Sequence, residues 1–310
     1  MRSLAPLVFG LPLVLACDAA PAQSPDAGAP FVAKTLSFST GDFVSPPGVE
    51  ITRCIYLPLG HEADALVGGY HARMLAGSHH FNMFFAEPTN PSVTGKPRGE
   101  LTDCDSGWKS YLAGSQWREL DEVMPEGIAI RIPAGSIIVL EAHYVNTTDG
   151  AVPARVEVEL DLVDPAKLTD ELGVYFNMLS DVRVEPGERV KLSGRCPTDA
   201  DVKLAVLTSH MHHYGERFEI NLISADGVSS PLYANDDYSH PSVLELWDAP
   251  IVLPAGSELE WSCLYSNQTD RAVIGGGSAE TEEMCMMAAF YYPRKTSQLY
   301  CTDDAARSTP

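Results

Sequence analysis

Apolar and polar residues alternate in several segments of the chain, which is the pattern of β-strands with one face towards water. The clearest segment is 156–162, with the sequence VEVELDL, and segments 218–222 and 258–265 repeat the alternation. No segment shows a sustained period of about 3.6 residues, so long amphipathic helices are not expected. The pattern predicts an all-β chain of antiparallel strands.

Turn signals rich in proline and glycine separate these segments. Two of them share the sequence Pro-Ala-Gly-Ser, at 133–136 and 254–257. The copies lie about 120 residues apart, close to one domain length, which indicates two similar β-domains in tandem. The best boundary follows a finished strand, so we expect an N-terminal domain over 31–165, a C-terminal domain over 166–301 and a tail over 302–310.

Composition narrows the classes of partner. The 310 residues are enough for two ordinary domains, each with a buried core. Asp and Glu number 42 against 21 Lys and Arg, for a net charge of −21. Such a chain lacks the basic surface that nucleic-acid binding needs, and its charge does not favour adhesion to anionic lipids. We therefore expect no nucleic-acid partner.

The first 30 residues predict export. A positive start and an apolar run indicate a signal peptide over 1–16, too short to span a bilayer as a stable helix. Val14-Leu15-Ala16-Cys17 resembles a bacterial lipobox, so we expect lipid on Cys17 and a flexible tether over 17–30. The protein would then be anchored by lipid alone to the cell envelope of a bacterium, in the periplasm or on the outer surface. Simple secretion, with cleavage after Ala22, is the alternative.

Histidines occur at spacings that suit a metal. His210 and His212 follow an apolar run, and imidazoles at i and i+2 of a strand point to one face, as a shared metal requires. His79 and His80 are adjacent and would point to opposite faces unless a β-bulge, made plausible by the preceding Gly-Ser, redirects one of them. His143 lies in a strand-like apolar run, where its buried ring needs a partner.

Each of these residues also has a structural interpretation. A lone buried histidine is more often hydrogen-bonded in a core than bound to a metal, and His61, His71 and His240 have no neighbour at ligand spacing. The methionines beside Cys285 could be core filler. Two histidine clusters plus a thioether in one exported chain nevertheless favour copper, because Cu(I) binds soft sulfur as well as imidazole.

Four motifs follow one another along the chain: His79-His80, Leu140-Glu141-Ala142-His143-Tyr144, His210-Met211-His212-His213 and Glu283-Met284-Cys285. Their order resembles the copper type II, ascorbate-dependent monooxygenases, the group that contains peptidylglycine α-hydroxylating monooxygenase and dopamine β-monooxygenase. Met124-Pro125-Glu126-Gly127 and Gly275-Gly276-Gly277-Ser278 add to the likeness, which extends from about Cys54 to Tyr292.

The resemblance implies two jelly-roll-like β-sandwich domains that face each other across a water-filled cleft, with one copper ion on each. The first copper would store and pass an electron, and its implied ligands are His79, His80 and His143. The second would be the catalytic copper that activates O2, and its implied ligands are His210, His212 and Met284. Ascorbate or a similar one-electron donor would reduce both ions, and the product would be a hydroxylated small molecule.

The resemblance also implies three disulfides: Cys54 with Cys104, Cys196 with Cys301, and Cys263 with Cys285. This pairing uses six of the seven cysteines, which agrees with lipid on Cys17. The Cys263–Cys285 bridge would fix the segment that presents Met284.

The departures from the family concern substrate. Peptidylglycine hydroxylases have an arginine two residues before the His-x-His motif, where it binds the peptide carboxylate, and this chain has Thr208. On the methionine strand, the residues expected on the ligand's face are Met286, Ala288 and Phe290, which are apolar. We therefore expect a substrate that is apolar or aromatic near the reacting carbon, and no peptide α-amidation.

Two other functional classes agree with the sequence. A periplasmic copper storage or delivery protein could use the same ligands without turnover. A surface interaction module could keep the sandwiches with incidental copper, although it would not need six ligands in this order. Ascorbate-dependent oxygen consumption separates an enzyme from both classes.

Overall fold

The computed structural model describes residues 34–104, 107, 109–296, 298–299, 301–303 and 306–308. The expected signal peptide, the lipidation site Cys17 and the tether lie outside these residues. Within the described part of the chain, no helix has the length and apolar character needed to cross a lipid bilayer.

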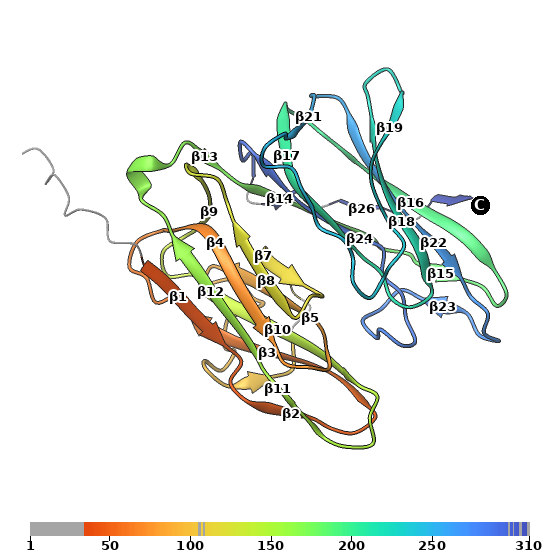
Figure 1. Cartoon of the computed structure of the whole chain (residues 1–310), viewed down its shortest axis with the longest axis horizontal. Coiled ribbons are helices and arrows are strands. Elements are labelled where there is room, and N and C mark those ends of the chain that lie inside the picture. Colours follow the sequence, from red (N-terminus) through yellow and green to blue (C-terminus); the bar gives the residue numbers. More distant parts are fainter. Residues whose placement is uncertain are drawn as a thin grey trace, which may run out of the picture. The chain divides into compact units, whose positions relative to one another are not determined.

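The first half of the chain forms two principal sheets (Figure 1). One sheet has the order β1-β12-β4-β9-β13, with β8 beside β4. Its strands are β1 (Lys34–Ser39), β12 (Val156–Leu162), β4 (Ala65–Met74), β9 (Ile128–Ile132), β13 (Asp170–Glu171) and β8 (Glu119–Val123). The other has the order β6-β3-β10-β5-β7, made of β6 (Leu101–Thr102), β3 (Val49–Pro58), β10 (Ile137–Asn146), β5 (Ser78–Ala86) and β7 (Ser110–Ser115). A separate pair joins β2 (Phe43–Ser45) and β11 (Val152–Ala154).

The second half forms two further sheets. One sheet has the order β20-β17-β24-β14-β25, with β21 beside β17 and β26 beside β14. Its strands are β20 (Leu244–Glu245), β17 (Val202–His210), β24 (Met286–Tyr292), β14 (Gly173–Leu179), β25 (Gln298–Leu299), β21 (Ile251–Leu253) and β26 (Thr302–Asp303). The other sheet has the order β19-β18-β22-β16-β27. Its strands are β19 (Ser229–Asn235), β18 (Gly215–Ile223), β22 (Glu258–Ser266), β16 (Arg189–Pro197) and β27 (Ala306–Ser308). A short pair joins β15 (Arg183–Val184) and β23 (Val273–Ile274).

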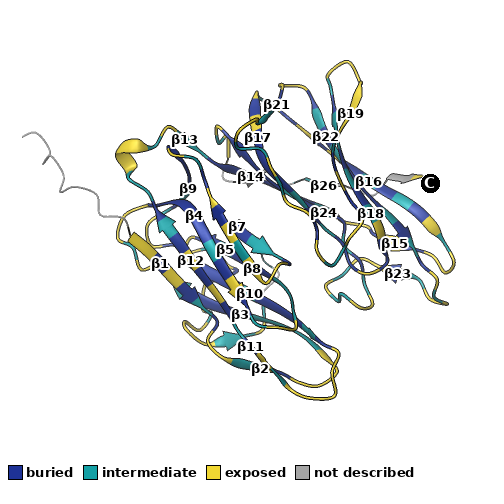
Figure 2. Ribbon diagram, viewed as in Figure 1, coloured by how far each residue is buried: buried dark blue, intermediate teal, exposed yellow. Residues whose placement is uncertain are grey.

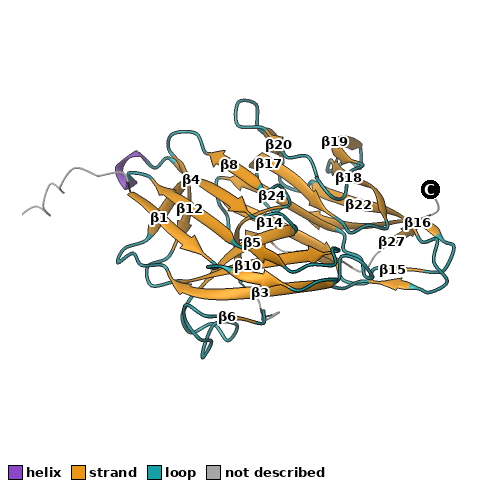
Figure 3. Ribbon diagram, turned by 60° about the horizontal axis from the view of Figure 1, so that its bottom comes forward, coloured by secondary structure: helices purple, strands orange, loops and turns teal. Residues whose placement is uncertain are grey.

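The all-β class expected from the alternating pattern is confirmed. The helical element among the described residues is the 3-10 turn η1 (Pro165–Lys167), and strands dominate the rest (Figure 3). Most strand pairs are antiparallel, with parallel pairs where β13 meets β9 and where β25 and β26 meet β14. The alternating segments 156–162, 218–222 and 258–265 lie in β12, β18 and β22.

Both halves repeat one strand order. The order β1-β12-β4-β9 recurs as β14-β24-β17-β21, and β3-β10-β5-β7 recurs as β16-β22-β18-β19. The two Pro-Ala-Gly-Ser turns occupy equivalent places, because the backbone N–H of Ala134 donates to Asp64 in one and that of Ala255 donates to Asp201 in the other. The sheets therefore share a topology. The division into two separate domains stays a prediction, since Ala33–Pro310 forms one compact unit.

Two buried asparagines fix equivalent turns in the two halves. The side-chain amide of Asn146 donates to the carbonyls of Ser45, Pro46 and Gly150. That of Asn267 donates to the carbonyls of Val184, Glu185 and Arg271. Both asparagines begin Asn-x-Thr sequons, but their amides are buried and bonded, so they act as structural turn residues in this fold.

Each half has its own apolar core between its two principal sheets (Figure 2). The sheet of β14, β17 and β24 is buried on both faces. Leu207 and Tyr291 belong to the core of the second half, whereas Val174, Val206 and Phe290 belong to the core cluster of the first half. A strand buried on both faces needs a continuous apolar run, which explains the sequence MMAAFYY of β24.

The three expected disulfides are confirmed. They join Cys54 to Cys104, Cys196 to Cys301, and Cys263 to Cys285. The bridge from Cys301 fixes the chain just before β26 and β27, so part of the segment expected to be a tail is paired with β14 and β16. Just after the boundary expected near residue 165, β13 pairs with the first-half strand β9.

Candidate copper centre

A β-bulge places His79 and His80 beside His143. On the ladder between β5 and β10, His80 pairs with His143, but Ser78 pairs with Tyr144, so His79 is the extra residue of the bulge. Gly77, at φ 89°, supplies the left-handed conformation that precedes it. The ring centroid of His143 lies 4.8 Å from that of His80 and 5.0 Å from that of His79. The irregularity expected from the sequence is therefore present.

The His-x-His motif lies where β17 ends. His210 is the last residue of the strand, and His212 is in the turn that follows, with ring centroids 5.1 Å apart. His213 is exposed and stacks on Tyr214, so it is not part of the pair.

The five histidines form one cluster. The ring of His79 lies 5.6 Å from that of His210 and 5.7 Å from that of His212, and His80 lies 5.1 Å from His210. Two triads have mutually close ligand atoms, and His79 belongs to both: His79, His80 and His143, and His79, His210 and His212. Histidines from both halves of the chain thus contribute to one cluster. The expected water-filled cleft, with one copper ion on each side, stays a prediction.

The ring nitrogens fit a transition metal such as copper or zinc. Four buried nitrogens have no hydrogen-bond partner among the described residues: Nε2 of His79, Nδ1 of His80, Nε2 of His210 and Nε2 of His212. Buried polar atoms are normally paired, and unpaired imidazole nitrogens that converge are the donor set that copper and zinc prefer. A third triad, Cys54, Cys104 and Glu141, is not a metal site because its cysteines form a disulfide.

Burial keeps these rings neutral. It lowers the pKa of His79 to about 3, with a further contribution from the nearby His143. Burial also lowers the pKa of His80 and His210 well below the ordinary value, and that of His212 to a smaller extent. Metal ligation needs the neutral imidazole, so these four rings are in the ligating form at neutral pH.

Glu50 in β3 orients His143. The Nε2–H of His143 donates to Oε1 of Glu50 at 2.8 Å, which leaves Nδ1 as the ligating nitrogen. Glu50 also accepts from the hydroxyl of Ser278 at 2.7 Å and from the N–H of Ala279 at 2.6 Å. Burial acts to raise the pKa of Glu50, but these hydrogen bonds outweigh it and hold the pKa below its usual value. The carboxylate therefore links the first triad to the glycine-rich segment of the second half.

Gln116 orients His210. The Nδ1–H of His210 donates to Oε1 of Gln116 at 2.8 Å, so Nε2 is the free donor. Gln116 follows β7 in the first half, and its amide donates to the carbonyl of Tyr238 in the second. His212 is oriented from its own half, since its Nδ1–H donates to the carbonyl of Glu282 at 2.9 Å.

Glu283 connects the His-x-His turn to Met284. Its carboxylate is fully buried and accepts from the N–H groups of His212 at 3.0 Å, Tyr214 at 2.7 Å and Met284 at 3.2 Å. Burial raises the pKa of Glu283 to about 7, against these hydrogen bonds. The Cys263–Cys285 bridge holds the next residue. The backbone of the expected thioether ligand is thus fixed to the same turn as His212.

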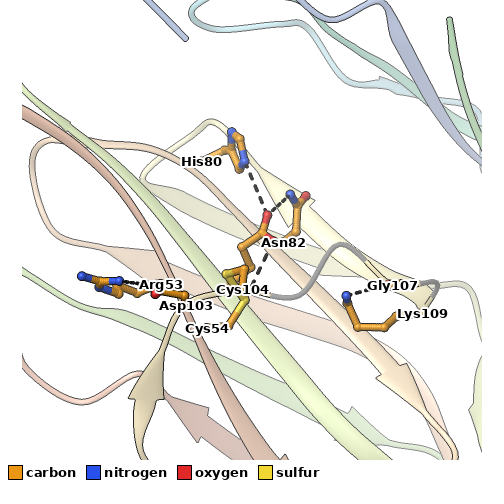
Figure 4. Close-up of a disulfide and its surroundings, with 9 residues drawn as sticks. Arg53, Cys54, His80, Asn82, Asp103, Cys104, Gly107 and Lys109 are labelled. Carbon is orange, nitrogen blue, oxygen red and sulfur yellow. Dashed lines mark hydrogen bonds and ion pairs between the residues drawn. A yellow bond between two sulfur atoms is a disulfide. The ribbon is translucent and has the colours of Figure 1, made fainter. Parts of the chain in front are cut away.

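Figure 4 shows the Cys54–Cys104 disulfide with His80 and Asn82 close to it. Glu141 lies between this disulfide and His80. Its Oε1 accepts from the side-chain amide of Asn82 at 2.9 Å and lies 3.9 Å from Nε2 of His80. Its Oε2 lies 3.9 Å from Sγ of Cys54. A carboxylate at this position favours the tautomer of His80 whose Nδ1 is free to ligate.

A cavity of about 460 Å³ adjoins the cluster. It is lined by His80, His143, His210, His212 and Met284 at one side. The residues expected to line a substrate pocket line the same cavity: Thr208, Met286, Ala288 and Phe290. The volume lies in the usual range for small-molecule sites.

Sequence reasoning did not identify Glu50 or Gln116 as parts of the site, and it quoted Glu141 in the motif around His143 without giving it a role. Each reaches its histidine through strand pairing or contact between distant segments, and no local spacing marks it. Glu283 was present in the quoted Glu-Met-Cys motif, but its buried carboxylate and three N–H donors are visible only in the fold.

Comparisons with known proteins agree with this geometry. Residues 171–309 match the copper type II ascorbate-dependent monooxygenase, C-terminal domain. MOXD1 homolog 1 of Drosophila melanogaster is 28% identical over 95 residues, which cover 30% of this chain and 14% of that protein. Dopamine beta-hydroxylase of Bos taurus is 26% identical over 140 residues, which cover 42% of this chain and 22% of that protein. The matched part of this chain thus spans less than a quarter of either relative.

Proposed function

Because the chain belongs, through its C-terminal half, to the copper type II ascorbate-dependent monooxygenase family, we propose that it hydroxylates an activated C–H bond of a small molecule. The co-substrates are O2 and a one-electron donor such as ascorbate. The observation that supports this most is the convergence of five imidazoles, four of which have a buried ring nitrogen without a hydrogen-bond partner among the described residues.

We assign two copper ions to the cluster. The triad His79, His80 and His143 would bind the electron-transfer copper, and the expected ligands of the catalytic copper are His210, His212 and Met284. Copper, when bound, supplies the one-electron chemistry that activates dioxygen. The protein orients its ligands through Glu50, Gln116 and the backbone carbonyl of Glu282.

The cavity supports an apolar substrate. Trp117 is 45% exposed and Val243 is 37% exposed, and both line the cavity, so its mouth has an apolar rim. Its wall includes Met286, Ala288 and Phe290. No lysine or arginine is among the described residues that line it, so a peptide carboxylate would have no cationic partner there. We infer that a glycine-extended peptide is not the substrate.

The location inferred from the N-terminal sequence completes the proposal. We propose a lipoprotein anchored through Cys17 to the cell envelope of a bacterium, where the three disulfides would be stable. Mass spectrometry of the mature protein tests this, and an unmodified N-terminus after residue 22 would contradict it.

The decisive experiment measures oxygen consumption by copper-loaded protein with ascorbate and an alkylbenzene, together with incorporation of labelled oxygen into the product. We expect turnover in the native protein and none in Met284→Ala or His143→Ala. His61→Ala is the matched control, because His61 is not among the clustered histidines.

The alternative is a copper storage protein, which the family match does not favour. Tight binding of copper without ascorbate-dependent turnover would support it and contradict the proposal. Turnover of a glycine-extended peptide as fast as any other substrate would contradict the inferred substrate class.

A further inference from the structure

Glu122 is a buried carboxylate that none of the preceding steps uses. It lies on β8 opposite Tyr70 of β4, is 3% exposed and lines the cavity. Glu122 and Glu141 are the two carboxylates among the described lining residues, and Glu141 is already bonded to Asn82 near His80. A buried carboxylate in an apolar wall is costly unless it is paired, so Glu122 needs an explanation.

One oxygen of Glu122 is bonded within the protein. Its Oε1 accepts from the indole N–H of Trp247 at 2.8 Å, a contact between the two halves of the chain. No described residue donates to its Oε2. Burial and the charge of Glu245 raise the pKa of Glu122, against the effect of the Trp247 hydrogen bond, so a further donor at its second oxygen would stabilise the carboxylate. The free oxygen is therefore a strong acceptor for any donor that enters the cavity.

Glu122 and the expected copper ligands lie beside different positions along strand β17. Trp247 follows β20, in which Glu245 pairs with Val206 of β17. His210 is four residues further along the same strand, a distance of about 13 Å for extended backbone. The cavity wall between these two positions includes Thr208, Ala288 and Phe290.

We propose that Glu122 recognises the substrate's head group: it accepts a hydrogen bond from a hydroxyl or an ammonium group, while an apolar body extends from there towards His210, His212 and Met284. This rests on the proposed function, because it assigns the cavity to the substrate. The chemical class is an elongated apolar molecule with one donor group at one end and the reacting carbon near the other. An anionic head group is excluded, because it would meet a carboxylate and no cationic side chain.

The test measures binding of four probes to copper-loaded protein by calorimetry: 5-phenylpentan-1-ol, 5-phenylpentan-1-amine, pentylbenzene and 5-phenylpentanoate. In Glu122→Gln we expect the alcohol or the amine to bind at least about tenfold more weakly, since a hydrogen bond to a carboxylate is lost or replaced by a weaker one. Pentylbenzene should bind equally to both proteins, and the carboxylate should bind better to the variant. A loss confined to the amine identifies an ammonium head group, and losses for both identify a hydroxyl or ammonium donor.

Matched controls separate recognition from structure. Glu119→Gln changes an exposed residue on the same strand and should alter none of the four affinities. Trp247→Phe removes the internal donor while leaving the carboxylate, so it should retain the preference for donor probes. Unchanged binding of the alcohol and the amine in Glu122→Gln, or an equal loss for pentylbenzene, would overturn the proposal. Because binding is measured without turnover, this result is independent of whether the protein hydroxylates any of the probes.

Discussion

His143 and Glu50 are joined by a hydrogen bond of 2.8 Å from Nε2–H to Oε1, and the same carboxylate accepts from Ser278 and Ala279. One side chain of β3 therefore sets the tautomer of a ligand on β10 and contacts the segment that precedes Met284. Glu50 thus orients one expected ligand of the first copper ion, so a change at Glu50 should alter the binding of that ion.

Glu50→Ala should weaken binding of one of two copper equivalents by about 10- to 100-fold, because a ligating histidine loses the carboxylate that orients it. Competition with a Cu(I) chelator measures this. Glu159→Ala, an exposed glutamate of β12, is the control. In a His143→Ala background the effect of Glu50→Ala should disappear, and an undiminished effect would show that Glu50 acts elsewhere.

Gln116→Leu should weaken the other copper equivalent by about tenfold or more, since the Nδ1–H of His210 loses its acceptor. Gln116→Glu keeps an acceptor and should retain most of the affinity. Gln268→Leu, at an exposed glutamine, is the control. Equal affinities in Gln116→Leu and the native protein would contradict an orienting role.

Glu283→Ala should lower the free energy of unfolding of the copper-free protein by at least about 3 kcal/mol, because three buried N–H groups lose their acceptor. Urea denaturation measures the loss. The exposed neighbour provides the control variant Glu280→Ala, which should change stability little. A similarly small loss of stability in both variants would contradict this prediction, because the three N–H groups would then have other acceptors.

The copper-free protein should lose stability as the pH falls from about 6.5 towards 3. The buried histidines have lowered pKa values, so below pH 6.5 the unfolded chain binds more protons than the native one. Each contributes up to about 1.4 kcal/mol per pH unit in this window. The contribution of Glu283 to stability depends on pH in the opposite direction. Its pKa is raised to about 7, so its stabilising contribution is lost as the pH rises.

Comparison of His210→Asn with the native protein isolates the contribution of one histidine to the pH dependence of stability. Between pH 7.5 and 5.0, His210→Asn should lose about 2 kcal/mol less stability than the native protein. His61→Asn is the control variant, since His61 is not among the clustered histidines. Parallel pH profiles for His210→Asn and the native protein would show that His210 is not buried in its neutral form.

Local patterns predicted much of the fold. The alternation of residues 156–162 corresponds to β12 and its buried and exposed faces. The bulge at His79 was foreseeable because adjacent strand residues cannot face one metal, and Gly77 supplies the unusual backbone conformation. The disulfide pairing followed from the family resemblance, because cysteine spacing alone leaves several connectivities open.

The sequence by itself determined the all-β class, because strand alternation is a local property. It also predicted the types of the metal ligands and an export signal, because imidazole chemistry and an N-terminal apolar run are local properties too. The tertiary structure alone decided that five imidazoles form one cluster, that Glu50 and Gln116 fix two of their tautomers, and that Glu122 faces the cavity with a free oxygen. These relationships join residues of different strands, and strand pairing with core packing creates them without any fixed spacing along the chain.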